Sequence, residues 1–278
     1  MSWVLFILAS SLFNASWGAL GKGRLGELSS IPFSFLFRGF VLLFYLPLFL
    51  LNFRTPVPPL FWVAALCSGL INAVMTMLLF EGIRKDFYST YSLRHTTPIF
   101  TWILATIFLG ETSNVYVISG ILLTAIGSLL FYGTKEFSWY GLSCALLSGA
   151  ESIFDKIGVD LSSPYTYPFV CYIITVLTLG ILILSRGVER VGFVETASKW
   201  KSILPLSCLS FLAILTGFVA LKMAPVSWVV PAGRIRVLFG FGLSYFCLRE
   251  REGWRLRLLA GSIIVAGTLL IALKGTIS

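Results

Sequence analysis

Long apolar runs separated by short polar breaks make up almost the whole chain. The runs are about 20 residues long, which is the length that an α-helix needs to cross the hydrocarbon core of a bilayer. Breaking the sequence at charged and Pro/Gly-rich points predicts ten spans, at residues 2–20, 32–52, 60–80, 88–109, 113–132, 137–155, 166–185, 203–222, 226–247 and 256–273. The longest connection, Arg186 to Ser202, is too short for a soluble domain. The pattern therefore predicts an all-α integral membrane protein.

The apolar pattern occurs twice along the chain. Residues 80–130 and 218–270 each run through an apolar stretch to a proline, Pro98 in the first and Pro231 in the second. Each then reaches a Leu-x-Glu step and resumes with a glycine-punctuated apolar run. The matching positions are Leu109–Glu111 with Gly120 and Gly127, and Leu248–Glu250 with Gly261 and Gly267. A duplicated, almost wholly apolar chain is typical of transporters built from two halves.

Each half of the duplication holds five predicted spans, the first half in residues 1–133 and the second in residues 134–278. Because five is an odd number, the halves are predicted to insert in opposite orientations, as two inverted five-helix repeats (5+5). The recurring glycines are typical of close contacts between membrane helices. Most loop Lys and Arg residues follow odd-numbered spans, and the positive-inside rule then places both termini outside the cytoplasm.

Composition agrees with lipid as the solvent of this chain. Hydrophobic residues are 57% of the sequence and charged residues 12%, whereas soluble domains carry about 25% charged residues. The net charge of +9 comes from basic residues that stand singly or in short groups between apolar runs, which is typical of membrane edges and not of a nucleic-acid surface. The sequence holds no phosphate-binding loop, nucleophile elbow or Cys/His cluster, so we expect no catalytic residues, no metal and no cofactor.

Charged residues deep in a span are the first candidates for function, since each costs about 2.5–3.5 kcal/mol on insertion scales. Arg94 and His95 lie one turn before Pro98, which cannot donate a hydrogen bond to the carbonyl of Arg94, so this carbonyl could face a cavity. Arg234 follows Pro231 by three residues and shares its helix face. We therefore expect helix breaks at both prolines and a central cavity of positive potential, suited to a carboxylate or phosphate.

Glu151 is the deepest predicted carboxylate and the candidate for carrying a coupling proton. Its counterpart in the first half is Trp17, so the halves differ at a position where a substrate would need asymmetry. Two other interpretations remain open. Arg94 could pair with Glu151 as a packing bridge, and Arg38, about one turn into its span, could extend to the membrane interface.

Polar and aromatic residues on otherwise apolar spans complete the candidate substrate site. Together with Arg94, His95, Glu151 and Arg234, the candidate substrate-binding residues are Asn14, Trp17, Asn72, Tyr91 and Trp228. Asn14 and Asn72 could instead form hydrogen bonds between helices. Further residues that could line a cavity are Thr76, Tyr88, Trp102 and Tyr172.

The ordered set of these elements resembles a known family. The first half carries Trp17-Gly18 with Lys22, Arg38, Pro98, Gly110-Glu111, Gly120 and Gly127. The second half carries Asp155-Lys156, Pro231, Arg249-Glu250 and Gly267. Over nearly the whole chain this order resembles the drug/metabolite transporter superfamily, in particular its EamA-type ten-span members, although Arg249 stands where glycine is usual. The resemblance implies cytoplasmic termini, opposite to the loop charges.

The sequence and the resemblance together predict a secondary transporter that exports a small organic metabolite, such as an amino acid, from the cell through the plasma or inner membrane. Its partners would be the substrate, the lipid bilayer and protons as coupling ion. One alternative is a carrier of phosphorylated or nucleotide-linked sugars. Another is a membrane-embedded enzyme on a lipid-linked substrate, for which His95 with Glu81 or Glu151 would be the acid/base pair. The oligomeric state stays open.

Overall fold

A computed structural model of the chain describes residues 2–21, 29–52, 58–85, 90, 93–132, 137–185, 187–246 and 254–274. Within these ranges the chain forms helices and turns and no strand, which confirms the all-helical class. The first-half helices are α1 (Ser2–Gly21), α2 (Ser30–Asn52), α3 (Pro59–Lys85), α5 (Thr97–Leu109) and α6 (Val115–Tyr132). The later helices are α7 (Trp139–Leu161), α8 (Tyr167–Ser185), α9 (Gly187–Ser198), α10 (Trp200–Met223), α11 (Val226–Ala232), η2 (Gly233–Ile235), α12 (Arg236–Phe246) and α13 (Trp254–Lys274).

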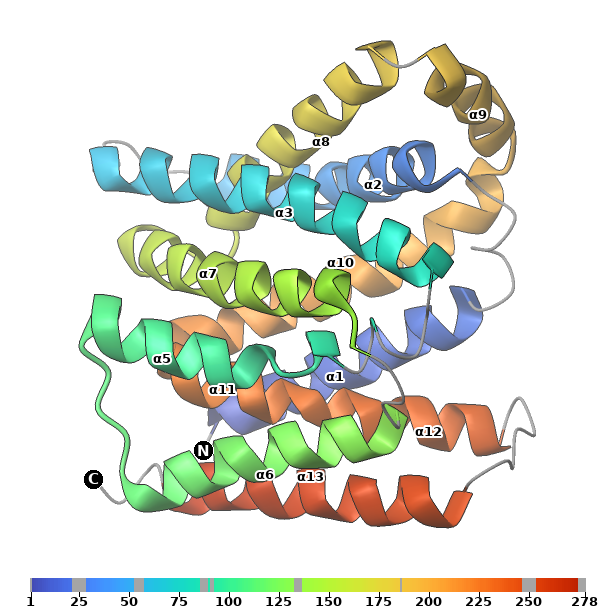
Figure 1. The fold of residues 1–278 in the computed structure, drawn as a ribbon. Helices are drawn as coiled ribbons and strands as arrows, with labels where there is room; N and C mark the ends of the chain where they lie inside the picture. The colour runs from blue at the N-terminus through green and yellow to red at the C-terminus, as the bar shows by residue number, and fades with distance from the viewer. Residues whose placement is uncertain are drawn as a thin grey trace.

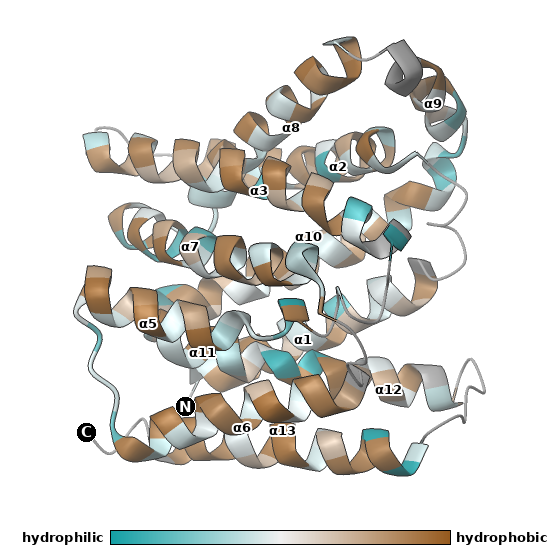
Figure 2. Ribbon diagram, viewed as in Figure 1, coloured by the Kyte–Doolittle hydropathy of each residue, from teal (hydrophilic) through white to brown (hydrophobic). Residues whose placement is uncertain are grey.

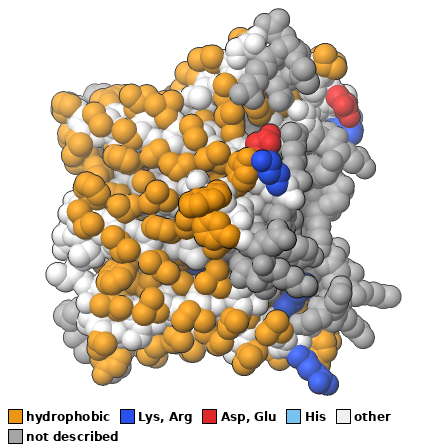
Figure 3. Space-filling model, viewed as in Figure 1, with side chains coloured by type: hydrophobic (Ala, Val, Ile, Leu, Met, Phe, Trp, Pro, Cys, Tyr) orange, Lys and Arg blue, Asp and Glu red, His pale blue; other side chains and the backbone are white. Residues whose placement is uncertain are grey.

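Most helices lie side by side and run across the view of Figure 1, with α6 and α13 along the bottom and α8 and α9 at the top. The start of α1 and the end of α13 lie toward the left of this view. Hydrophobic residues dominate most helices in Figure 2, and hydrophobic side chains cover much of the described part of the face seen in Figure 3. Seven helices in the described ranges are long and apolar enough to cross a membrane. The chain is therefore an integral membrane protein.

Three predicted elements differ from the structure. The fourth predicted span, 88–109, is broken, because His95 and Thr96 form a turn before α5 begins at Thr97. The predicted connection from Arg186 to Ser202 contains helix α9. The sixth predicted span ends too early at residue 155, since α7 continues to Leu161 through a charged stretch.

Helices α6 and α13 touch at glycines, which confirms the predicted close packing at Gly120, Gly127 and Gly267. A Cβ on Gly120 would lie 2.7 Å from the carbonyl oxygen of Gly267, and one on Gly127 would lie 2.9 Å from that of Ala260. Because the contact partner moves backward along α13 as the position moves forward along α6, the two helices run antiparallel. Gly261 instead faces the side chain of Leu238 in α12.

Aromatic side chains join α2 to α8 in the same antiparallel sense. The rings of Phe49 and Phe169 stack at 4.3 Å, and those of Tyr45 and Tyr172 lie 6.5 Å apart. Such ring pairs stabilise a contact beyond the burial of their area. The start of one helix therefore lies beside the end of the other. This packing holds Tyr172 at the cavity.

We expect Gly267→Ala to lower the stability of the protein. The new methyl group would lie 2.6 Å from the carbonyl oxygen of Gly120, and backbone cannot move aside without separating α6 from α13. Overpacking of this kind costs about 1–3 kcal/mol. Thermal unfolding in detergent measures the effect. Gly240→Ala on α12, where a Cβ meets no atom within 4 Å, is the control, and an equal loss in both variants would contradict the close-contact explanation.

Candidate functional site

The first helix break stands just before α5. Residues 93 and 94 are helical, His95 and Thr96 form a turn, and Pro98 occupies the first turn of α5. Proline fits there because its missing N–H would have no partner in a first turn. The carbonyl of Arg94, which we expected to be open to a cavity, accepts a hydrogen bond of 2.6 Å from the Thr97 hydroxyl. The break is thus closed locally by a threonine side chain.

The second break lies at the corresponding point of the other half. Helix α11 ends at Ala232, one residue after Pro231, and the 3₁₀ turn η2 carries Arg234 before α12 begins at Arg236. The Ser11 hydroxyl of α1 donates a hydrogen bond of 3.3 Å to the carbonyl oxygen of Gly233. This backbone carbonyl, at the interruption of the helix, thus has a side-chain partner. Each half therefore presents an interrupted helix with an arginine at the interruption.

The two breaks gather three arginines around one histidine. Arg94, Arg234 and Arg236 all act electrostatically on the ring of His95, and Arg94, Arg234 and Arg236 also line the central cavity. A guanidinium Nη1 of Arg234 lies 3.0 Å from His95 Nδ1. Both His95 and Arg234 are buried, at 4% and 5% exposure. The arrangement forms an arginine cluster, here defined as Arg94, Arg234 and Arg236.

Carboxylates gather on α7. Glu151 and Asp155 are four residues apart, so they lie on one helix face, and both line the cavity. Glu151 Oε1 accepts a hydrogen bond of 2.5 Å from the Asn72 amide of α3, and Asp155 Oδ1 accepts one of 2.6 Å from the Ser68 hydroxyl. Helix α3 thus supplies a donor to each member of this carboxylate pair.

Arg38 contacts Tyr172 at the cavity. Its Nη1 donates to the hydroxyl of Tyr172 at 2.9 Å, and its guanidinium lies 5.1 Å from the centre of the same ring. Arg38 also interacts electrostatically with Glu151 and lines the cavity. Arg38 therefore has a polar partner within the protein and borders the cavity, in addition to the interfacial position that the sequence left open.

A cavity of about 310 Å³ lies between the arginine cluster and the carboxylate pair. Helices of both halves line it, from α1, α2 and α3 to α10, α11 and α12. Within the described residues, no group of three or more His, Cys, Asp or Glu side chains could hold a metal ion. The cavity therefore offers cations on one side and carboxylates on another, an arrangement that can bind a small molecule with both kinds of charge.

The structure places the other predicted residues in three ways. Asn14 and Asn72 line the cavity. Trp17 packs on Phe37 with the ring centroids 5.2 Å apart, and Trp228 packs on Trp3 at 6.4 Å, so these two tryptophans belong to packed aromatic groups outside the cavity lining. Tyr91 lies outside the described residues.

Sequence reasoning missed Asp155 as a site residue. The predicted span ended at residue 155, so its carboxylate seemed to mark a helix end. Its spacing of four from Glu151 was a usable signal, because that spacing places both side chains on one face. No ion pair joins Arg94 to Glu151 among the described contacts. Instead, Glu151 is held by Asn72.

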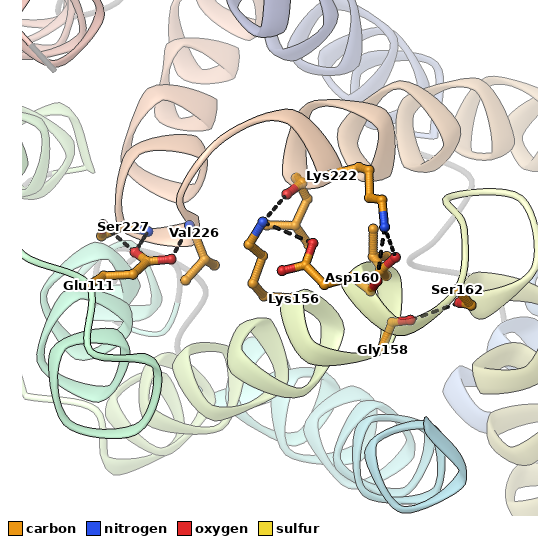
Figure 4. A network of polar contacts seen from close by, with 10 residues as sticks. Glu111, Lys156, Gly158, Asp160, Ser162, Lys222, Val226 and Ser227 are labelled. Atoms are coloured by element: carbon orange, nitrogen blue, oxygen red, sulfur yellow. Dashed lines mark hydrogen bonds and ion pairs between the residues drawn. The ribbon is translucent and has the colours of Figure 1, made fainter. Parts of the chain in front are cut away.

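Figure 4 shows a second group of polar contacts, between the end of α5 and the start of α11. Glu111 follows α5, which ends at Leu109 and is capped by Gly110 in the left-handed conformation, with a φ of 66°. It accepts hydrogen bonds from the backbone N–H groups of Val226 at 2.9 Å and Ser227 at 3.0 Å, and from the Ser227 hydroxyl at 2.5 Å. A negative charge is favourable at a helix N-terminus, where N–H groups are otherwise unpaired.

Two lysines join the ends of α7 and α10 in the same view. Lys156 of α7 donates to the carbonyl of Leu221 at 2.9 Å, and Lys222 of α10 donates to the carbonyls of Val159 at 2.8 Å and Asp160 at 3.0 Å. Each ammonium group thus lies at the carboxyl end of the other helix, where the helix dipole favours a cation. Leu221 also lines the cavity, so these contacts lie at the boundary of the cavity. We refer to Glu111, Lys156 and Lys222 as the end network.

These features define a class: an all-helical integral membrane protein with broken helices around a charged internal cavity, which is the construction of membrane transporters. Residues 1–133 match the profile of the EamA-like transporter family. This match over the first half of the chain confirms the resemblance, and the matched family belongs to the drug/metabolite transporter superfamily. No curated protein matches the sequence.

Solved structures share the fold. One, whose title is only "Crystal structure of protein", aligns with a TM-score of 0.78 over 99% of this chain and 99% of its own, at 15% sequence identity. An identity this low supports the fold alone. The family match over residues 1–133 suggests a membrane transporter of the drug/metabolite type, and membership of such a family implies a small-molecule substrate.

Proposed function

We propose that this chain is a secondary transporter that exports a small organic metabolite, such as an amino acid, across the plasma or inner membrane. It works by alternating access, in which one five-helix half rocks against the other around a cavity near the bilayer midplane. Protons supply the coupling ion, and Glu151 carries the coupling proton. Arg94 and Arg234 bind the anionic end of the substrate.

The observation that carries the proposal is the distribution of charge around the cavity. The arginine cluster lies at the two helix breaks, and Glu151 and Asp155 lie on α7. A carboxylate on a substrate matches the planar guanidinium groups, and an ammonium group matches the carboxylate pair. The volume of about 310 Å³ is at the lower end of the about 300–1,000 Å³ that ligand pockets occupy, which favours a small metabolite.

Helix pairing supports two inverted repeats, residues 1–133 and 134–278. The helices that would correspond, α2 with α8 and α6 with α13, pack antiparallel. The end of α5 likewise meets the start of α11, through Glu111. An inverted repeat requires this relation, because each helix must run opposite to its counterpart. The family match also ends at residue 133, where we place the repeat boundary.

The end network supports alternating access. It joins the end of α5 to the start of α11, and the end of α7 to the end of α10 (Figure 4). The bonds between different helices run from a charged side chain to a helix end, so they can break and reform as whole helices move. We infer that the network holds this end closed in the state described here.

A carrier of phosphorylated or nucleotide-linked sugars is the second candidate. Three arginines around one cavity would suit a phosphate, which binds guanidinium groups through paired hydrogen bonds. The carboxylate pair argues against it, since Glu151 and Asp155 would repel a phosphate. The cavity volume also favours a phosphorylated sugar over a nucleotide-linked one.

A thermal-shift screen of the purified protein against amino acids, nucleosides and phosphorylated metabolites tests the proposal. A ligand that binds the folded state stabilises it by about 2.7 kcal/mol at a hundredfold excess over Kd. We expect an amino acid to raise the unfolding midpoint and Arg94→Ala to remove this shift. Arg255→Ala, at an exposed arginine of α13, is the control and should keep the shift. A shift with phosphorylated compounds alone would favour the second candidate, and a shift retained in Arg94→Ala would contradict the site.

A further inference from the structure

We infer that His95 is a positioning residue: as a neutral imidazole that carries its proton on Nε2, it accepts a hydrogen bond from Arg234 and ties the two helix breaks together. The role in transport rests on the proposed function, whereas the tautomer and the bond do not. Neither the family match nor the cavity lining assigns this role, because His95 lies behind the cavity wall and Arg234 lies in it.

The chemistry of the pair fixes the direction of the hydrogen bond. Nη1 of Arg234 lies 3.0 Å from Nδ1 of His95. A guanidinium has five N–H donors and no acceptor, and it stays charged in proteins. Nδ1 must therefore be the acceptor, which leaves the ring proton on Nε2. An imidazolium, in which both nitrogens donate, cannot form this bond.

The surroundings of His95 agree with a neutral ring. Arg94 precedes it on its own segment, Arg234 contacts it from η2, and Arg236, at the start of α12, also acts on it electrostatically. A proton added at Nδ1 would remove the acceptor and place a further positive charge among three guanidinium groups. His95 is thus unsuited to carry a coupling proton while the bond is formed, and the carboxylate pair, Glu151 and Asp155, is left to carry it.

The hydrogen bond between His95 and Arg234 links the two helix breaks. His95 forms the turn before α5 in the first half, and Arg234 lies in the 3₁₀ turn of the second half, 139 residues later. One hydrogen bond therefore connects the two interruptions and holds the guanidinium of Arg234 at the cavity wall. Arg234, not His95, contacts the substrate, and His95 determines where Arg234 lies.

The tautomer can be measured directly, because the chain has a single histidine. In protein labelled with ¹⁵N-histidine and studied by NMR in detergent or bilayers, all imidazole signals belong to His95. We expect an unprotonated Nδ1 and a protonated Nε2 at neutral pH. Arg234→Lys, which keeps a donor, and Arg236→Leu, which removes a neighbouring charge but not the bond, should preserve this tautomer. Arg234→Leu should alter the Nδ1 signal.

Flux measurements separate positioning from mere packing. His95→Asn offers an amide oxygen near the position of Nδ1, whereas His95→Leu keeps the volume without an acceptor. With the metabolite that gives the largest shift in the thermal-shift screen, we expect His95→Leu to raise KM about tenfold, since a hydrogen bond to a charged group is lost. His95→Asn should stay within about threefold of the unsubstituted protein and keep its response to a pH gradient.

Different outcomes would contradict the hydrogen bond, the positioning role of His95 or the proposed function. A doubly protonated ring, an Nδ1–H tautomer, or an unchanged spectrum in Arg234→Leu would overturn the hydrogen bond. Equal flux defects in His95→Asn and His95→Leu, or no defect in His95→Leu, would overturn the positioning role. If no metabolite binds in the screen, the proposed function fails, while the NMR result still decides the bond.

Discussion

Glu151→Gln is expected to abolish flux of the screened metabolite in proteoliposomes while leaving yield and thermal stability close to those of the unsubstituted protein. Glutamine has nearly the same shape, and its amide oxygen can still accept the hydrogen bond from Asn72, which Glu151 receives at 2.5 Å. What is lost is the negative charge and the ability to bind a proton. A hydrogen bond to a charged group is worth about 1.5–3 kcal/mol, so binding should weaken about 10- to 100-fold, and proton coupling should disappear.

The control for this variant is Glu195→Gln. Glu195 is an exposed residue of α9 that pairs with Lys199 at 3.5 Å, away from the cavity. It should leave flux unchanged.

Asp155→Asn tests the other member of the carboxylate pair. If flux responds to a pH gradient in Glu151→Gln but not in Asp155→Asn, the coupling proton is carried by Asp155 and not by Glu151. Full flux in both Glu151→Gln and Arg94→Ala would contradict the site.

Much of the fold could be predicted because the bilayer imposes simple rules on sequence. A run of apolar residues long enough to cross it must be a helix, since backbone groups in lipid need internal partners. The first predicted span, 2–20, corresponds to α1, Ser2–Gly21. Glycine spacing likewise predicted close helix packing, because only small residues allow two helix backbones to approach closely; that the partners are α6 and α13 came from the structure.

Hydropathy did not predict the helix bounds correctly where a segment is surrounded by polar groups and not by lipid. Helix α7 carries charges through its second half because that face meets the cavity and the end network, so the predicted span stopped at residue 155, six residues before the helix ends at Leu161. Helix α9 was predicted as a connection because it is too short and too polar for a span. In both cases tertiary surroundings, and not the local pattern, decide the structure.

The sequence likewise predicted some features of the candidate site and not others. The cost of burying a charge singled out Arg94, Glu151 and Arg234, and the structure brings them around one cavity. Orientation around a helix axis could not be read from one sequence. Trp17 and Trp228 therefore looked like lining residues, although they pack against Phe37 and Trp3. Pairings between residues far apart in sequence, such as Arg38 with Tyr172, were not visible to any local pattern.

Glu111→Gln is expected to open the end of the molecule that the end network closes. The carboxylate accepts two backbone N–H groups and one hydroxyl group at the start of α11. A glutamine amide has a single acceptor oxygen and no charge, so at least one N–H loses its partner, and the favourable interaction with the helix dipole disappears. Since hydrogen bonds to a charged group are worth about 1.5–3 kcal/mol, the ratio of closed to open molecules should fall about 10- to 100-fold.

Hydrogen exchange measures this change directly, because the amides of Val226 and Ser227 are the groups that Glu111 protects. Their exchange should accelerate in Glu111→Gln. The amides in the last turn of α10 should also exchange faster, because this is the helix end whose Leu221 carbonyl accepts a hydrogen bond from Lys156. Glu195→Gln again serves as the matched control and should leave exchange at the start of α11 unchanged. If exchange accelerates only at Val226 and Ser227, Glu111 is a local helix cap. If it accelerates across both α10 and α11, the end network opens as one unit, as alternating access requires.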